Sequence, residues 1–278
     1  MLSCGKYQFD LSRPLIMGII NLTPDSFAND GRNLSANAAL SYAQQMIEDG
    51  ADILDIGGES TRPGAAPVSV QQELDRVMPV IEHLCGSTVP VSIDTYKPEV
   101  MRAALAAGAS MVNDINALQQ EETLTVVAES NAAVCLMHKQ GMPQTMQHRP
   151  HYQDVIYEVL QFLRARIAST VAAGIARERI TIDPGFGFGK TLQHNLTLLG
   201  HLDQLDELDL PILVGMSRKS MLGTITGRDV QQRVHASVAA ALLAVQRGAR
   251  IVRVHDVAAT SDALRVWHAL QQANGEQQ

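Results

Sequence analysis

The sequence predicts an α/β protein, a single (β/α)8 TIM barrel over residues 1–278 with its active site at the C-terminal ends of the strands. Short apolar runs recur along the chain, and each is followed by turn residues and a helix-like stretch. Apolar strands that alternate with helices are typical of a parallel sheet covered by helices. Eight such units in 278 residues fit a closed barrel better than an open doubly wound sheet. No GxGxxG pattern follows the first run, which argues further against a dinucleotide-binding fold.

The predicted strands share an apolar, often β-branched composition and are bounded by turn residues. In chain order they cover residues 15–21, 51–57, 89–94, 111–114, 133–138, 180–183, 211–217 and 251–255. The segments between them are amphipathic or rich in alanine, as expected for helices that pack on a sheet. The clearest of these cover residues 36–48, 71–84, 98–107, 152–173 and 231–247. No linker or charge run divides the chain, so we expect one domain.

Composition excludes several classes of protein. The chain is 46% hydrophobic with a formal net charge of −7, which excludes an intrinsically disordered chain and argues against a generic nucleic-acid binder. No apolar run approaches the ~20 residues needed to cross a bilayer, and the N-terminus lacks the pattern of a signal peptide. The three cysteines are widely spaced, which suits free thiols in a reducing compartment. We therefore expect a cytoplasmic protein that binds neither nucleic acid nor membrane.

Polar residues gather where the predicted strands end. Most of the apolar runs finish in a residue that is costly to bury, namely Asn21, Asp55, Asp94, Asn113, His138, Asp183, Ser217 or His255. Barrel active sites lie at these ends, so this ring of polar residues is the expected site. In residues 251–255, Val252 and Val254 share one face of the strand, and Arg253 and His255 share the other. If the valines pack on helices, Arg253 and His255 point into the mouth of the barrel.

Two loops after the first strands have the composition of ligand-binding segments. Residues 57–64 (GGESTRPG) combine glycines with hydroxyl and guanidinium groups, which suits a loop that grips an anion. Residues 21–31 (NLTPDSFANDG) are long and polar and could form a mobile lid, although a helix cap and turn at residues 23–25 is the plainer interpretation. The amide oxygen of Asn21 could serve as one ligand of Mg²⁺ beside a phosphate.

A glycine-rich segment, residues 185–191 (GFGFGKT), suggests a phosphate loop at first sight. The GxxxxGK[ST] pattern would need glycine at position 184, where the chain has Pro184. A glycine-rich strand-to-helix loop, with Asp183 at its base, is the better interpretation, since it would let a flat ligand approach the backbone.

Four basic residues, Arg218, Lys219, Arg253 and His255, follow the seventh and eighth predicted strands. The loops after these strands form the usual phosphate-binding corner of such barrels. Lys219 alone could suggest a Schiff-base aldolase, but its neighbours in sequence are polar, which argues against the apolar pocket that such a lysine needs.

Asp94, Asn113 and Asp183 end three further strands. Their carboxylates and amide match a ligand with several N–H donors, such as an aminopyrimidinone. A metal cluster and an acid–base pair remain open alternatives from spacing alone.

Together these motifs resemble the dihydropteroate synthase family. The matching stretches span about residues 14 to 256 in the family's order: 18–27 (GIINLTPDSF), 55–64 (DIGGESTRPG), 92–95 (SIDT), 97–98 (KP), 112–115 (VNDI), 136–138 (LMH), 183–190 (DPGFGFGK), 217–220 (SRKS) and 253–255 (RVH). Small departures stand at Ala28, Asn29 and Lys139, and they put the kinetics of the lid in doubt rather than the reaction.

The resemblance implies a barrel that joins p-aminobenzoate to a dihydropterin methyl diphosphate with Mg²⁺, and a homodimer. It implies that Asp94, Lys219, Arg253 and His255 are catalytic. Residue by residue, the implied pterin contacts are Asp94, Asn113, Met137, Asp183 and Lys219, and the implied metal ligand is Asn21. The implied contacts to the diphosphate or its lid are Thr61, Arg62, Arg253 and His255. The implied wall for p-aminobenzoate, and for the sulfonamides that mimic it, is Pro63, Phe188, Lys219 and Ser220.

The chemistry agrees with this resemblance. An aromatic amine is already neutral near pH 7, so the reaction needs no strong general base, and no nucleophile–base pair stands out in the sequence. Two alternatives are a pterin-dependent methyltransferase, which would not need the basic corner, and a non-catalytic pterin-binding paralogue. A generic aldolase would instead allow borohydride trapping of substrate on Lys219.

Overall fold

The structure of the protein, a computed structural model, is described for residues 1–23, 36–61 and 64–275. Most of the expected lid, including Ala28 and Asn29, lies outside these ranges. Arg62 and Pro63, two of the expected substrate contacts, also lie outside the described residues.

Eight parallel strands close into a barrel in the order β10-β3-β4-β5-β6-β7-β8-β9, which confirms the predicted fold. The strands are β3 (Leu15–Asn21), β4 (Ile53–Gly57), β5 (Val91–Asp94), β6 (Met111–Asp114), β7 (Ala133–Met137), β8 (Ile180–Asp183), β9 (Ile212–Val214) and β10 (Ala249–Val254). Three strands, β4, β5 and β9, begin later than predicted. Of these, β5 and β9 begin directly after Pro90 and Pro211, because proline has no N–H to donate to a ladder. Both prolines still accept a ladder hydrogen bond through their carbonyl oxygens.

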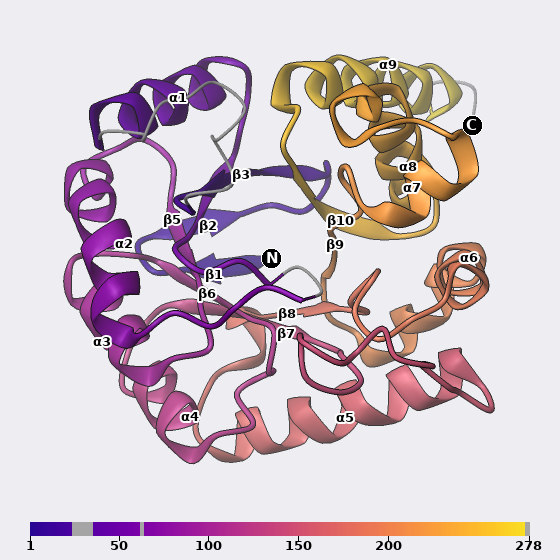
Figure 1. The fold of residues 1–278 in the computed structure, drawn as a ribbon. Helices are drawn as coiled ribbons and strands as arrows, with labels where there is room; N and C mark the ends of the chain where they lie inside the picture. Colours follow the sequence, from indigo (N-terminus) through magenta and orange to yellow (C-terminus); the bar gives the residue numbers. More distant parts are fainter. Residues whose placement is uncertain (24–35, 62–63, 276–278) are drawn as a thin grey trace.

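Helices surround the strands on the outside of the barrel (Figure 1). They are α1 (Ala36–Glu48), α2 (Val70–Leu84), α3 (Pro98–Ala106), α4 (Glu121–Ala128), α5 (Val155–Ala172), α6 (Leu192–Gly200), α7 (Ser220–Thr226), α8 (Val234–Gln246) and α9 (Val257–Gly275), with short 3-10 turns at η3 (Arg177–Arg179), η4 (Leu202–Leu208) and η5 (Val230–Gln232). Helix α5 starts three residues later than predicted because the Asp154 side chain caps it by accepting from the N–H groups of Ile156 and Tyr157. No helix in the described ranges is long and apolar enough to cross a bilayer.

A short antiparallel hairpin that we did not predict, β1 (Leu2–Cys4) and β2 (Tyr7–Phe9), closes the N-terminal end of the barrel. Leu2 and Cys4 are fully buried and join an apolar cluster with strand residues such as Leu15 and Met17. The Cys4 thiol donates to the carbonyl oxygen of Ser110. The hairpin therefore acts as a plug. Each strand of this hairpin is too short to stand out as an apolar run of the kind by which we predicted the others.

The strands have two apolar faces, one toward the helices and one toward the barrel interior. Val252 and Val254 pack in the large cluster beneath the helices, as the alternation predicted. The inward positions of the same strands form the smaller cluster near the N-terminal end, which includes Met17, Ile53 and Ile251. The next inward positions on these strands, two residues after Ile53 and Ile251, are occupied by Asp55 and Arg253. The interior thus changes from apolar to charged along the barrel axis.

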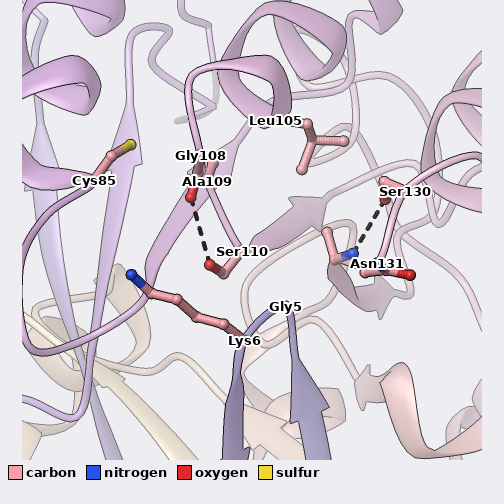
Figure 2. A pocket seen from close by; sticks show the side chains of 10 residues that line it. Gly5, Lys6, Cys85, Leu105, Gly108, Ala109, Ser110, Ser130 and Asn131 are labelled. Atoms are coloured by element: carbon pink, nitrogen blue, oxygen red, sulfur yellow. Dashed lines mark hydrogen bonds between the residues drawn. The ribbon is translucent and has the colours of Figure 1, made fainter.

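A hollow of about 440 Å³ lies at the N-terminal face, beside the turn of the hairpin. It is lined by the hairpin turn (Gly5, Lys6), by the end of α2 (Cys85) and by the segments that lead into β6 and β7 (Leu105, Gly108, Ala109, Ser110, Ser130, Asn131 and Ala132), as Figure 2 shows. None of the residues implicated by sequence lines it. The three cysteines are free thiols, of which Cys4 and Cys135 are buried.

Candidate active site

The floor of the barrel mouth is an ion triad that joins three strands. Arg253 on β10 donates through Nε to Asp55 Oδ2 on β4 at 2.6 Å and through Nη2 to Asp94 Oδ2 on β5 at 2.6 Å. Asn113 on β6 donates its amide to the same Asp55 oxygen at 3.1 Å. The structure therefore brings Asp94, Asn113 and Arg253 together: Arg253 binds Asp94 directly, and Asp55 joins Asn113 to Arg253.

Burial and charge shift the pKa values of this triad in ways that suit a binding floor. Burial raises the pKa of Asp94 to about 7, an effect that Arg253 opposes and the Asp55 charge reinforces. Burial alone would lower the pKa of Arg253, but the carboxylates of Asp55 and Asp94 outweigh it and raise that pKa. Arg253 is thus a permanent cation, whereas Asp94 is held near the point of ionisation.

Lys219 lies across the mouth, at the start of α7. Its ammonium donates to the carbonyl oxygen of Phe186 at 2.5 Å and lies 4.7 Å from the centre of the Phe188 ring. Burial lowers the pKa of Lys219 to about 8, while Asp183 acts in the opposite direction. The ammonium therefore lies partly against an aromatic face, a contact that the polar neighbours of Lys219 in sequence did not predict. The pocket is not purely apolar, since Asp183 and the carbonyl stabilise the cation.

The glycine-rich loop is shaped by contact with the neighbouring loop after β7. Gly185 and Gly189 have φ angles of +69° and +62°, which glycine adopts readily. A Cβ at Gly185 would collide with the carbonyl oxygen of His138, and one at Gly189 with that of Gln140. We expected these glycines to let a flat ligand approach the backbone, but in the structure they allow the backbone of the loop after β7 to lie close to this one. Gly187 is different, because a Cβ there would meet the Lys219 side chain at 3.3 Å.

Lys190 ends this loop and turns inward. Only 3% of the residue is exposed, and its ammonium bonds His138 Nδ1 at 2.9 Å and the carbonyl oxygen of Gly185 at 2.9 Å. Burial lowers the pKa of Lys190 to about 7 and that of His138 to about 2. A phosphate-loop lysine would point toward solvent-accessible phosphate, so this orientation agrees with rejecting that motif.

The basic corner is less cationic than the sequence suggested. Arg218, in the left-handed region at φ 58°, forms an ion pair with Asp256 through two nitrogens. His255 bonds the Ser217 hydroxyl through Nδ1 at 3.0 Å, and its backbone N–H reaches the same oxygen. Arg218 and Arg253 are thus both paired with carboxylates, which balances their charges within the protein.

The loop after β4, residues 57–64, is called the anion loop because its composition suits anion binding. Buried charged side chains hold its described end. Lys97 forms ion pairs with Glu59, in the loop, and with Glu73 of α2. Tyr96 donates to the same Glu59 carboxylate at 2.7 Å. Thr61 is half-buried just beyond this anchor. The sequence pointed to Lys97 only as part of a motif, and its role as an anchor depends on contacts between distant elements.

The remaining expected contacts occupy the rim. Met137 ends β7 beside Asp183 in the register, and Ser220 begins α7 in an exposed position. Asn21 ends β3, and its Oδ1 and Asp94 Oδ2 lie against the same point, at 3.7 and 3.6 Å from where a Cβ of Gly57 would stand.

Within the described ranges, no group of three or more His, Cys, Asp or Glu side chains could hold a metal ion. The rim offers the Asn21 amide oxygen, since Asp94 Oδ2 already accepts from Arg253. A single protein oxygen fits Mg²⁺, which retains waters and takes further oxygens from a bound phosphate.

Comparison with known proteins gives consistent results. The "pterin binding enzyme" family matches residues 17–255. The dihydropteroate synthase of Neisseria meningitidis serogroup C is 54% identical over 271 residues, which cover 96% of each chain. A Yersinia pestis dihydropteroate synthase solved with a sulfonamide drug complex superimposes with a TM-score of 0.94 at 49% identity, covering 98% of this chain and 99% of that one. A Burkholderia cenocepacia dihydropteroate synthase complexed with 7,8-dihydropteroate gives 0.91 at 52% identity, covering 99% and 98%.

Proposed function

The chain belongs to the pterin-binding enzyme family, and we propose that it condenses p-aminobenzoate with (7,8-dihydropterin-6-yl)methyl diphosphate to form 7,8-dihydropteroate and pyrophosphate. It is a transferase of folate biosynthesis that forms a C–N bond with loss of diphosphate. The observation that carries this proposal is the agreement of full-length similarity with a barrel floor of carboxylates, amide and cations.

The pterin would lie on the floor formed by Asp94, Asn113 and Asp183, with Met137 against its ring. Carboxylate and amide oxygens accept the several N–H groups that an aminopyrimidinone presents. Asp94 has one oxygen engaged by Arg253, which leaves the other for the substrate. Lys219 completes this subsite from the opposite side, close enough to Asp183 for their charges to interact.

The chemistry requires stabilisation of a leaving group more than proton transfer. The reacting carbon is a methylene on an electron-rich ring, so loss of diphosphate leaves a delocalised cation that Asp94 and Asp183 would favour. His255, Arg253 and the anion-loop residues Thr61 and Arg62 would stabilise the departing negative charge in a site from which water is excluded. The neutral amine of p-aminobenzoate then forms the new bond, and its surplus proton is lost to solvent.

Mg²⁺ is the cofactor we propose for this site. Asn21 would supply one oxygen ligand, and the diphosphate and water would supply the others. When bound, the metal neutralises charge on the leaving diphosphate.

p-Aminobenzoate would bind beside Phe188, Lys219 and Ser220, with Pro63 closing the wall. Sulfonamides that mimic p-aminobenzoate would compete for this subsite, in keeping with the drug named with the Yersinia structure. Because that wall includes the loop after β4, we propose ordered binding. The pterin diphosphate binds first and closes the loops after β3 and β4, which builds the subsite for p-aminobenzoate. Equal and independent binding of p-aminobenzoate without diphosphate would contradict this order.

We further propose a cytoplasmic homodimer. Helices α6 to α9 pack in sequence against one another, and each exposes at least one large apolar side chain, for example Leu196, Ile225, Leu243 and Val266. Free thiols such as Cys4 and Cys135 suit a reducing compartment. Sedimentation of the purified chain would measure the dimer directly.

The decisive experiment is pyrophosphate release from the pterin diphosphate plus p-aminobenzoate, with and without Mg²⁺. We expect release only with both substrates and the metal, and a loss of about 1,000-fold in kcat/KM for Lys219→Ala, which removes about 4 kcal/mol of transition-state stabilisation. Tight pterin binding without release would instead identify a non-catalytic pterin-binding protein, and methyl transfer to a corrinoid would identify the related methyltransferase. Borohydride trapping of substrate on Lys219 would identify an aldolase.

A further inference from the structure

Lys190 is the most deeply buried cation whose charge the proposed reaction does not use. With 3% of the residue exposed, its ammonium has lost its water and needs protein acceptors for all three protons. The structure supplies them: His138 Nδ1 at 2.9 Å, the Gly185 carbonyl oxygen at 2.9 Å and the Phe188 carbonyl oxygen at 3.2 Å. The His138 carbonyl oxygen lies at 3.5 Å. This cradle is complete without any ligand.

The histidine in the cradle is fixed as an acceptor. For Nδ1 to accept from an ammonium, the imidazole must be neutral and carry its proton on Nε2. Burial and the Lys190 charge both lower the pKa of His138, which favours the neutral ring. The ring is also held by edge-on contact with Phe162 at 4.9 Å. His138 is therefore held in a fixed position directly after β7, and Lys190 connects the glycine-rich loop to it by a hydrogen bond.

The two lysines of this region divide the carbonyl groups of one loop between them. Lys190 bonds the carbonyl oxygens of Gly185 and Phe188 from the inside. Lys219 bonds the carbonyl oxygen of Phe186 from the mouth and lies over the Phe188 ring. The same loop thus carries two groups that orient the Lys219 ammonium, and Lys190 holds Gly185, directly before the first of them, and Phe188, which carries the second.

Asp183, Asn195 and Gln147 also hold this loop, but none of these three binds the carbonyl oxygens that Lys190 engages. Asp183 accepts from the Gly185 N–H at 2.7 Å, and Asn195 accepts from the Gly187 N–H at 2.8 Å. Three glycines in left-handed conformations make the segment flexible when it is not held. The Phe188 N–H donates to the Gly185 carbonyl oxygen and closes a turn. Lys190 binds the carbonyl oxygens of the first and last residues of this turn, Gly185 and Phe188.

We infer that Lys190 is a positioning residue, whose ammonium fixes the 185–188 loop against His138 and so places the Phe186 carbonyl and the Phe188 ring that orient Lys219. This inference rests on the proposed function for its kinetic consequence, because Phe188 and Lys219 are the proposed wall for p-aminobenzoate. Lys190 itself touches no substrate. Its loss should impair p-aminobenzoate binding more than the bond-forming step.

The experiment compares Lys190→Met with Lys6→Met, a matched loss of an exposed lysine in the hairpin turn at the opposite face of the barrel. Hydrogen exchange of peptides covering residues 185–189 should become about tenfold faster in Lys190→Met, while Lys6→Met matches the wild type. This measurement needs no catalysis. Unchanged exchange in Lys190→Met would overturn the inference, and a wild-type chain that releases no pyrophosphate would overturn the proposed function instead.

Kinetics then separate positioning from a general loss of stability. For Lys190→Met, we expect KM for p-aminobenzoate to rise about tenfold and kcat to change by less than about threefold. Lys190→Gln keeps two N–H donors without the charge, and its KM should lie between those of Lys190→Met and the wild type. It also supplies the same readouts if Lys190→Met does not fold.

A double-variant cycle with Phe188→Leu tests whether the effect passes through the loop. If it does, adding Lys190→Met to Phe188→Leu should raise KM by no more than about twofold. Fully multiplicative effects on KM, or a KM within about twofold of wild type in Lys190→Met, would show that Lys190 supports only the fold.

Discussion

The two ends of the barrel interior are built on the same strands yet have opposite chemistry. At the N-terminal end the inward positions are apolar, as at Met17 and Ile53, and a hairpin covers them. Two residues beyond Ile53 on the same strand, Asp55 is fully buried and forms an ion pair with Arg253. Because neighbouring inward positions differ this sharply, the fold separates the residues that stabilise it from those that we propose to bind substrate.

The most direct way to break this comparison is a truncation at each end. Met17→Ala removes a fully buried side chain from the apolar end and should lower the free energy of unfolding by about 3 kcal/mol. Its KM values and kcat, measured where it remains folded, should match the wild type. Lys219→Ala should instead lower kcat/KM and leave the free energy of unfolding near the wild-type value. Urea titration measures the free energy of unfolding of both variants. A catalytic defect in folded Met17→Ala would show that the two ends are coupled.

A change at Asp55 sharpens the comparison, because this residue is buried like the core but charged like the mouth. Asp55→Asn preserves its shape and weakens its hold on Arg253, so kcat/KM should fall about 30-fold. Since the Asp55 charge raises the pKa of Asp94, the acidic limb of the pH profile should also move to lower pH. The kcat/KM profile of both proteins over pH 5 to 9 is the measurement.

A shift of that limb to higher pH, or none, would contradict the electrostatic link. The matched control is Ser92→Ala, a buried change on β5, the strand that carries Asp94, which should leave the position of the limb unaltered.

The smallest expected effect is the pH profile of the unmodified enzyme. In the proposed site Asp94 would accept from the pterin when ionised, so kcat/KM should fall as pH drops below about 7, where burial holds its pKa. Lys219 would act as a cation, so activity should also fall as pH rises above its lowered pKa of about 8. A bell-shaped profile is expected, and its basic limb includes the loss of the Lys190 charge, because burial also lowers that pKa, to about 7. The two limbs therefore belong to the coupled site as a whole. A flat profile from pH 5 to 9 would rule out both assignments.

Much of the molecule follows from local sequence. Period-2 alternation predicted that Val252 and Val254 face the helices and Arg253 the interior, because side chains of a strand must point to opposite faces. The ring of polar strand ends predicted the mouth, since parallel strands bring those ends to one edge. We predicted the starts of β5 and β9, which follow Pro90 and Pro211, one or two residues too early, and the missing N–H of proline explains both differences.

The pairing of charges could not be predicted in this way. We placed Arg218 and Arg253 together in a basic corner, but Asp256 and Asp55 neutralise them. Glycines that we assigned to a ligand instead allow two loops to touch. Residues 62–63 and most of the first loop lie outside the described ranges, so the expected roles of Arg62 and Pro63 stay predictions.

By itself, the sequence determined the barrel, the faces of its strands and the types of residue at its mouth, because these depend on periodicity over a few neighbouring residues. Only the tertiary structure decided which of those residues meet. Arg253 reaches Asp55 across 198 positions and Asp94 across 159, and Lys190 reaches His138 across 52. Such pairs form only when the barrel closes and water is excluded, since charges attract strongly enough to choose partners only at short range in a low-dielectric interior.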